Sequence, residues 1–79
     1  MEEFNTNMEL RVLLLAIYKA PSEDSLKDVL KTMENSNVFD LKTGKKYLKK
    51  LKELDFLNDN GLTFIGTQKA KEVELEFKL

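Results

Sequence analysis

The chain has 79 residues, of which 42% are apolar and 34% are charged, and its formal net charge is −1. This length and composition are typical of one soluble globular domain, here residues 1–79, and exclude a disordered tail. The chain contains no Cys and no His, which excludes disulfide bonds, Cys/His zinc sites and catalytic pairs of a nucleophile with histidine.

The first predicted helix follows Asn7, a favourable N-cap, and continues to about Lys19, because Pro21 disfavours helical backbone in the residue before it. Apolar side chains surround nearly the whole helix: Leu10, Val12, Leu13, Leu14, Leu15, Ile17 and Tyr18. Such a helix needs cover on several sides. We expect this cover from a second copy, in a homodimer through this helix and the C-terminal segment. The alternative is that the two segments cover each other within one chain.

The second predicted helix follows Pro21, with Ser22 as its N-cap and acidic residues in its first turn. Its apolar residues recur at spacings of three and four and form one stripe: Leu26, Val29, Leu30 and Met33. The turn-forming sequence ENSN, residues 34–37, ends this helix.

The third predicted helix covers residues 41–54 and begins after Asp40, which can cap its N-terminus. One side of it carries Leu41, Gly44, Tyr47, Leu48, Leu51 and Leu54. The other side carries Lys42, Lys45, Lys46, Lys49, Lys50 and Lys52. The segment thus holds six lysines and one glutamate, a balance of +5, whereas the remaining residues hold seven basic and thirteen acidic groups, a balance of −6. This segregation produces a local positive field that the net charge hides.

A short hairpin is predicted next, with strands at residues 56–57 and 62–63 around the turn Asn-Asp-Asn-Gly at 58–61. Thr63 is placed to cap a last helix, which carries Gly66, Ala70, Val73 and Phe77 on one face. Residues 73–79 alternate strictly between apolar and polar, so they suit a strand as well as a helix.

The order helix, helix, helix, hairpin, helix resembles that of the winged helix-turn-helix family of DNA-binding domains. The residues that carry the likeness are YLKKLKELDFLNDNGLTFIGTQKAKEV, 47–73, and the match extends back to Ser25. Within it, Leu48, Leu51 and Leu54 are similar to the core side of that family's recognition helix, and LTFIG at 62–66 is similar to its Leu-Thr-x-x-Gly junction. The resemblance implies a mainly α fold with a small β-hairpin, a winged helix.

By the same resemblance, helix 41–54 enters the major groove of double-stranded DNA and the 58–61 tip lies near the backbone or minor groove. The expected contact residues are Lys42, Thr43, Lys45, Lys46, Lys49, Lys50, Lys52, Asn58 and Asn60. The first four lie in the half that usually approaches base edges, and Lys49, Lys50 and Lys52 are expected on phosphates. A basic face on a rigid helix can also neutralise several phosphates whatever the family.

We therefore predict a small DNA-binding homodimer that regulates transcription. The alternative is a winged helix that binds other proteins and not DNA, because helix 41–54 has no Arg, Asn or Gln to read bases and the hairpin tip carries Asp59. Tyr47 is expected at the edge of the core, with base stacking or a phosphate bond as its alternative roles.

No feature predicts chemistry. The pairs Glu2-Glu3 and Glu23-Asp24 are adjacent and not convergent, and the sequence around FLNDNG lacks the acidic residues of a calcium loop. We expect no enzyme, metal, cofactor or small-molecule substrate. The longest apolar run, VLLLAIY at 12–18, is shorter than the roughly 20 residues that span a bilayer, and the start MEEFNTN is unlike a secretory signal. These features and the absence of Cys predict a cytoplasmic protein without a membrane partner.

Overall fold

Four helices and one short hairpin make up the described part of the chain. The computed structural model describes residues 4, 6–20, 26–59 and 61–77. The elements in chain order are α2 (Met8–Lys19), α3 (Leu26–Asn35), α4 (Leu41–Glu53), β1 (Leu57–Asn58), β2 (Gly61–Leu62) and α5 (Phe64–Phe77). The predicted class, mainly α with a small β-hairpin, is confirmed, and the element order is compatible with a winged helix.

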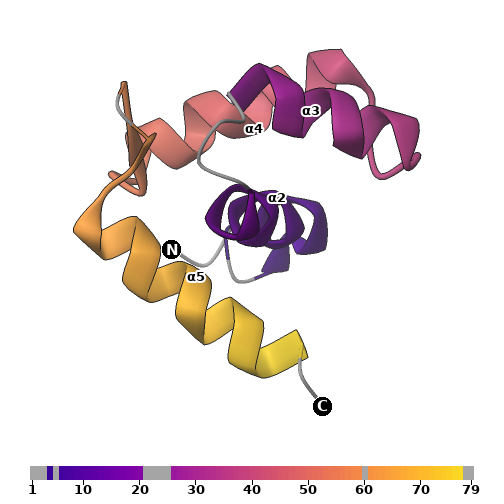
Figure 1. The fold of residues 1–79 in the computed structure, drawn as a ribbon. Helices are drawn as coiled ribbons and strands as arrows, with labels where there is room; N and C mark the ends of the chain where they lie inside the picture. The colour runs from indigo at the N-terminus through magenta and orange to yellow at the C-terminus, as the bar shows by residue number, and fades with distance from the viewer. Residues whose placement is uncertain (1–3, 5, 21–25, 60, 78–79) are drawn as a thin grey trace.

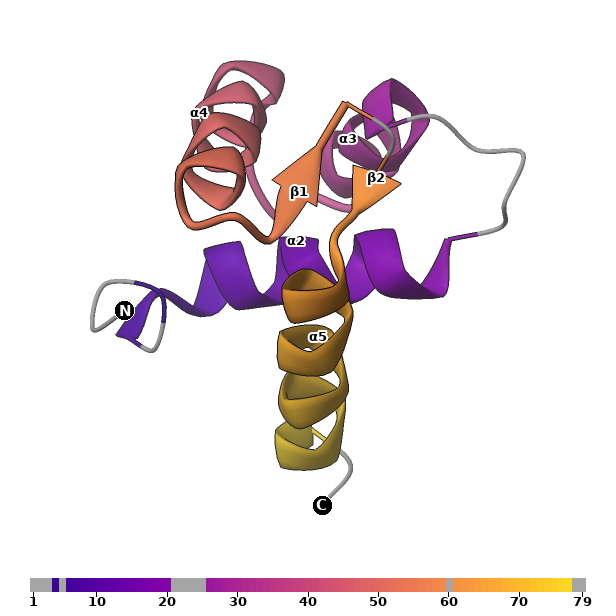
Figure 2. The ribbon, with the colours of Figure 1, turned by 90° about the vertical axis from the view of Figure 1, so that its left-hand side faces the viewer.

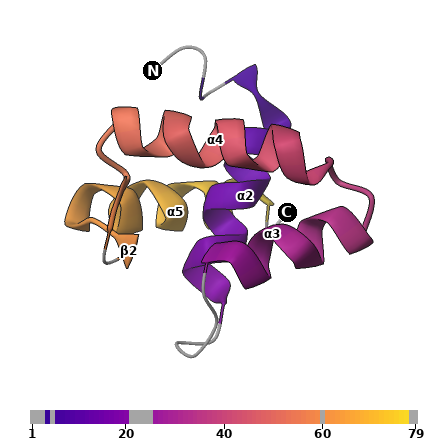
Figure 3. The ribbon, with the colours of Figure 1, turned by 90° about the horizontal axis from the view of Figure 1, so that it is seen from above.

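The helices lie in three levels, with α2 in the middle (Figure 1). On one side of α2, α3 and α4 lie beside each other, and on the other side α5 crosses it (Figure 2). Seen from above, α3 and α4 lie on either side, and α2 and α5 are visible between them (Figure 3). The hairpin connects the end of α4 with the start of α5, so the two outer levels are joined along one edge.

The central position of α2 explains why its sequence is apolar on nearly every side. As predicted, the helix begins after Asn7, whose side-chain oxygen accepts a hydrogen bond from the Leu10 amide at 3.1 Å. Leu10, Leu13 and Leu14 are completely buried. The residues of this helix that pack against the core at partial exposure are Leu15, Ala16, Ile17 and Tyr18. α2 and α5 therefore cover each other within one chain, as in the monomer alternative.

The turn between α3 and α4 positions the basic helix. α3 ends in a Schellman motif, in which Asn37 adopts a left-handed φ of 60° and the Val38 amide donates to the Met33 carbonyl at 3.0 Å. The predicted cap of α4 is confirmed, because Asp40 accepts from the Thr43 amide at 2.7 Å. The predicted start of α3 at Ser22 lies outside the described residues.

A close contact at Gly44 sets the distance between α4 and the neighbouring helix α3. A Cβ atom at this position would lie 2.7 Å from a Leu30 methyl carbon and 2.8 Å from the Phe39 ring. Phe39 is buried against this glycine and also meets the Tyr47 ring edge to face, with the centroids 5.4 Å apart. Glycine therefore lets α4 approach α3 closely enough to bury the Phe39 ring.

The strands of the hairpin have the predicted length of two residues each but lie one residue nearer the turn than predicted. Residues 57–58 pair with 61–62, in the register Leu57 to Leu62 and Asn58 to Gly61, whereas the sequence suggested pairing at 56–57 and 62–63. The position of the paired residues has two causes. Gly61 can extend the ladder because it adopts a φ of 122°, and Phe56 leaves the strand to fill the core, with its ring 5.3 Å from that of Phe4. One bond, from the Thr63 amide to the Phe56 carbonyl, continues beyond the ladder.

The last helix starts at a cap formed by Thr63, as predicted. The Thr63 hydroxyl accepts from the Gly66 amide at 2.9 Å and donates to the Asp55 carbonyl at 2.5 Å. The buried face of α5 consists of Gly66, Ala70 and Val73, and Phe77 lies at its more exposed end below the Arg11 guanidinium. Residues 73–79 suited a helix or a strand in the sequence, and the structure shows helix as far as Phe77. Residues 78–79 lie outside the described part.

None of the helices in the described ranges is both long and apolar enough to cross a membrane.

The end of α4 offers a stabilising substitution at Asp55. Its φ of 63° places an acidic residue in the left-handed position of a second Schellman motif, in which the Phe56 amide donates to the Leu51 carbonyl at 2.9 Å. Glycine adopts this conformation without steric cost and removes a negative charge from the negative end of the helix dipole. We expect Asp55→Gly to raise the free energy of unfolding by about 1 kcal/mol in urea denaturation.

A matched substitution at the same position should act in the opposite direction. Asp55→Val should lower the free energy of unfolding, because a branched side chain resists a positive φ. Equal stability of the two variants would contradict the assigned backbone conformation.

Candidate nucleic-acid interface

One line of lysines follows the solvent side of α4. Four of them recur at spacings of three and four residues and are called the basic stripe: Lys42, Lys45, Lys49 and Lys52. All four are exposed, because Gly44 and Leu51 turn the opposite side of the helix into the core. The stripe spans ten residue steps, about 15 Å of helix, and roughly nine phosphate charges lie along that length of duplex DNA.

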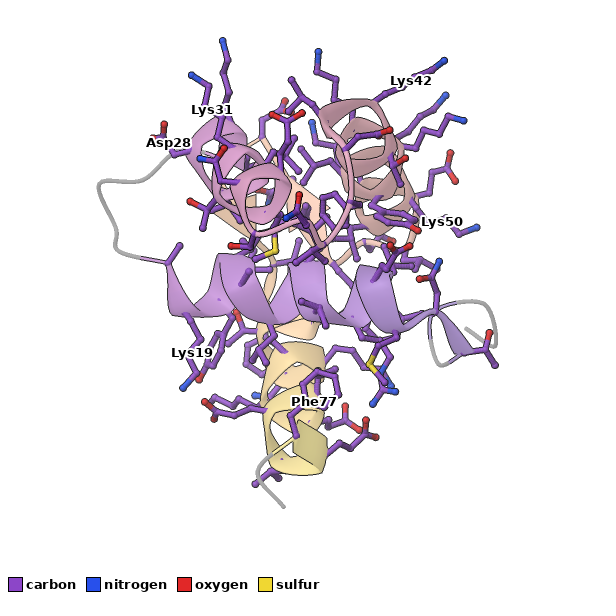
Figure 4. The ribbon with its side chains drawn as sticks, turned by 90° about the vertical axis from the view of Figure 1, so that its right-hand side faces the viewer. Lys19, Asp28, Lys31, Lys42, Lys50 and Phe77 are labelled. Atoms are coloured by element: carbon purple, nitrogen blue, oxygen red, sulfur yellow. The ribbon has the colours of Figure 1, made fainter. Side chains whose placement is uncertain are left out.

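Three other predicted contact residues of α4 lie beside the stripe. Lys46 is exposed, whereas Lys50 and Thr43 are half-buried on the flank of the helix nearer α2. Figure 4 shows Lys50 pointing in a different direction from Lys42. The Thr43 amide donates to Asp40, so this residue contributes to the helix cap. The structure thus gathers five of the six lysines on one open side and places the sixth on the flank.

Acidic groups occupy the N-terminus of α4. Asp40 holds the Thr43 amide, and a Glu34 carboxylate oxygen accepts from the Leu41 amide at 3.3 Å. The hydrogen bond from Thr43 lowers the pKa of Asp40 below its ordinary value, and the nearby Lys42 and Lys46 charges lower it further. An anion therefore meets carboxylates at the helix end, and the stripe along the middle of α4 is the more favourable place for a phosphate.

The hairpin tip adds an acidic group to the far end of the stripe. The Asp59 carboxylate lies 3.7 Å from the Lys52 ammonium, and both side chains are well exposed, so the pair is weak. Asn58 is exposed on β1, and Asn60 lies outside the described residues. The other three stripe lysines form no ion pair with any residue in the described ranges. Their charges are available to a partner.

Two further lysines were missed by the sequence analysis. Lys27 and Lys31 are exposed on α3, one turn apart and opposite its buried residues Val29 and Leu30. Figure 4 shows Lys31 and Lys42 pointing to the same side of the molecule from neighbouring helices. Their spacing marks them as surface residues in the sequence, but only the packing of α3 beside α4 joins them to the basic stripe.

Tyr47 lies at the edge of the core, as expected. It is half-buried, and its hydroxyl donates to a Glu9 carboxylate oxygen at 2.7 Å, which connects α4 to α2. This hydrogen bond is the main cause that raises the pKa of Tyr47 above its ordinary value of 10.0. A hydroxyl with this partner is held within the protein, so the alternative roles in stacking or phosphate binding have no support from the geometry.

The Tyr47–Glu9 bond predicts a loss of stability in alkaline solution. Because the pKa of Tyr47 is raised in the folded state, its contribution is fully present below pH 10.0 and is lost as the pH rises through the raised value. Tyr47→Phe should lower the free energy of unfolding at neutral pH by about 1 kcal/mol. In an absorbance titration of tyrosinate, it should also remove the step that belongs to Tyr47, which lies above pH 10.0. A titration unchanged by the substitution would contradict the bond.

The arrangement as a whole can bind a polyanion but offers little to distinguish bases. Its open side presents ammonium groups, which are point charges, and none of the planar side chains that bind base edges in pairs. Comparison of the chain with protein-family models, curated protein sequences and solved structures found no match. The basic stripe and its surroundings are therefore the features from which a function can be inferred.

Proposed function

We propose that this protein binds double-stranded DNA through the basic stripe, supported by Lys46 and the two exposed lysines of α3. In this proposal the protein acts in the cytoplasm as a homodimer and regulates transcription. The carrying observation is the segregation of charge: α4 exposes five lysines and one glutamate, and the acidic surplus lies elsewhere. A face that serves only solubility normally mixes both signs.

The direct test is binding of the purified protein to a random-sequence duplex across a series of salt concentrations. Each lysine that neutralises a phosphate contributes about 0.9 to the log–log slope, so we expect a slope of roughly −3 to −6. DNA from around the protein's own gene is the comparison for sequence specificity. A weak signal that does not depend on salt would overturn the proposal.

The second candidate function is binding of an acidic protein through the same stripe. Two observations favour it: α4 exposes no Arg, Asn or Gln, and Asp59 brings a negative charge to the hairpin tip. Retention of a defined acidic partner, together with no retention on duplex DNA at moderate salt, would support this alternative over DNA binding.

A further inference from the structure

Among the large apolar residues in the described part of the chain, those with the highest exposed fractions lie on α5. Phe64 is 78% exposed, Leu75 is 69% exposed, and Ile65 beside them is 57% exposed. Phe64, Gln68, Lys71 and Leu75 recur at spacings of four, three and four, so they form a line along the helix opposite its buried face. We call this line the outer stripe. It has apolar residues at both ends and polar residues in the middle.

The outer stripe is complementary to itself. If a second copy of α5 lies antiparallel, with the two-fold axis midway between Gln68 and Lys71, each Phe64 meets the other chain's Leu75. Gln68 then lies level with the other chain's Lys71, and its amide oxygen can accept from that ammonium. The same apolar contact forms twice, as a symmetric dimer requires.

The size of the outer stripe fits a reversible dimer. The exposed parts of Phe64, Ile65 and Leu75 amount to roughly 350–400 Å² of apolar surface per chain, about half of what each partner buries in a standard interface. An interface of this size is small, so we expect a weak, reversible dimer. The small area also favours a second copy over a larger partner, which would need a wider apolar surface.

The position of α5 determines the directions in which the two basic stripes of such a dimer point. α5 lies on one side of α2, and α3 and α4 lie on the other, with Lys31 and Lys42 pointing away from α5 (Figures 2 and 4). A two-fold contact through the outer stripe therefore places the two basic stripes on opposite sides of the dimer. They cannot both meet adjacent half-sites on one straight duplex.

We propose that the protein dimerises through the outer stripe of α5 and thereby bridges two separate segments of duplex DNA. The interface part of this inference stands on the geometry of α5 alone. The bridging part rests on the proposed function, DNA binding through the basic stripe. In such a dimer each basic stripe binds its own duplex, so the protein cross-links two duplexes.

The test uses Phe64→Ser with Leu75→Ser, and Met8→Ser as the control, since Met8 is 56% exposed on α2 away from the outer stripe. Sedimentation equilibrium should show a wild-type dimer that the double variant weakens by at least about tenfold and the control leaves intact. The wild-type protein and the control should let an immobilised duplex capture a free duplex. The double variant, which dimerises weakly, should capture less of it. Binding to one short duplex should be unchanged in the double variant.

Cysteine cross-linking tests the orientation, because the chain has no native Cys. A mixture of Phe64→Cys and Leu75→Cys chains should form disulfides between the two variants. Phe64→Cys alone should not, because its two copies lie about 16 Å apart along the paired helices. Disulfide formation by Phe64→Cys alone would overturn the antiparallel pairing.

The outcomes separate the two proposals. A wild-type protein that stays monomeric, or a double variant that still dimerises, overturns the interface. A dimer that binds a short duplex but captures no second duplex overturns the bridging. A dimer that binds no duplex overturns the proposed function and the bridging together, and leaves the interface standing.

Discussion

Replacing Lys45 and Lys49 together by glutamine should weaken binding to a short duplex by roughly 60-fold near 0.1 M salt, and should reduce the log–log salt slope by about 1.8. Both numbers follow from about 0.9 for each phosphate contact that is lost. The two side chains are exposed at the middle of the basic stripe and form no ion pair within the described residues. Their removal should therefore leave the free energy of unfolding nearly unchanged, within about 0.5 kcal/mol.

Lys19→Glu is the matched control because it changes the net charge by the same amount. This residue is exposed at the end of α2, and Figure 4 shows it on the side of the molecule away from Lys42. If binding depends on the position of the lysines, the control should keep most of its affinity for the short duplex. Equal losses in the two proteins would mean that only the overall charge matters. A folded double variant with wild-type affinity would exclude the basic stripe as the DNA-binding surface.

Gly66→Ala should be the most destabilising single methyl addition in the described chain, lowering the free energy of unfolding by about 3 kcal/mol. A Cβ atom at this position would overlap the Phe56 carbonyl oxygen and lie 2.8 Å from the carbonyl carbon. The obstacle is backbone, so no side-chain rotation can relieve it. At an ordinary helical site the same substitution would stabilise by about 1 kcal/mol, so the expected sign is reversed.

Urea denaturation of Gly66→Ala beside Gln68→Ala measures this effect. Gln68 is exposed on the same helix, and its substitution should change the free energy of unfolding by no more than about 0.5 kcal/mol. The denaturation midpoint of the glycine variant should fall while that of the control stays in place. A stabilised Gly66→Ala protein would show that the hairpin and α5 lie farther apart than described.

The features that the sequence predicted well depend on chemistry within a few residues. The caps at Asn7, Asp40 and Thr63 each use a side chain that accepts from an amide three residues ahead, so the local sequence contains the whole interaction. The apolar spacing of α3 and α4 likewise predicts their buried sides. The class of the fold followed from these elements and their order.

The features that the sequence did not predict depend on distant contacts. The strands of the hairpin lie one residue nearer the turn, in the expected register of Leu57 to Leu62, because Phe56 is drawn into the core against Phe4. The addition of Lys31 to the basic side depends on α3 packing beside α4. A helical wheel contains none of these neighbours. The sequence therefore predicted the exposed basic side of α4 but not the residues of other helices that lie beside it.

The hydrogen bonds of Thr63 would have a mechanical consequence in the proposed complex with DNA. The residue bonds to the Asp55 carbonyl at the end of α4, to the Phe56 carbonyl before β1 and to the Gly66 amide in α5. These bonds connect the helix that carries the basic stripe to the helix that carries the outer stripe through one residue, which restricts their relative motion. If two such chains join, the angle between the two DNA segments is set by the protein. Torque applied to one segment would then be transmitted to the other.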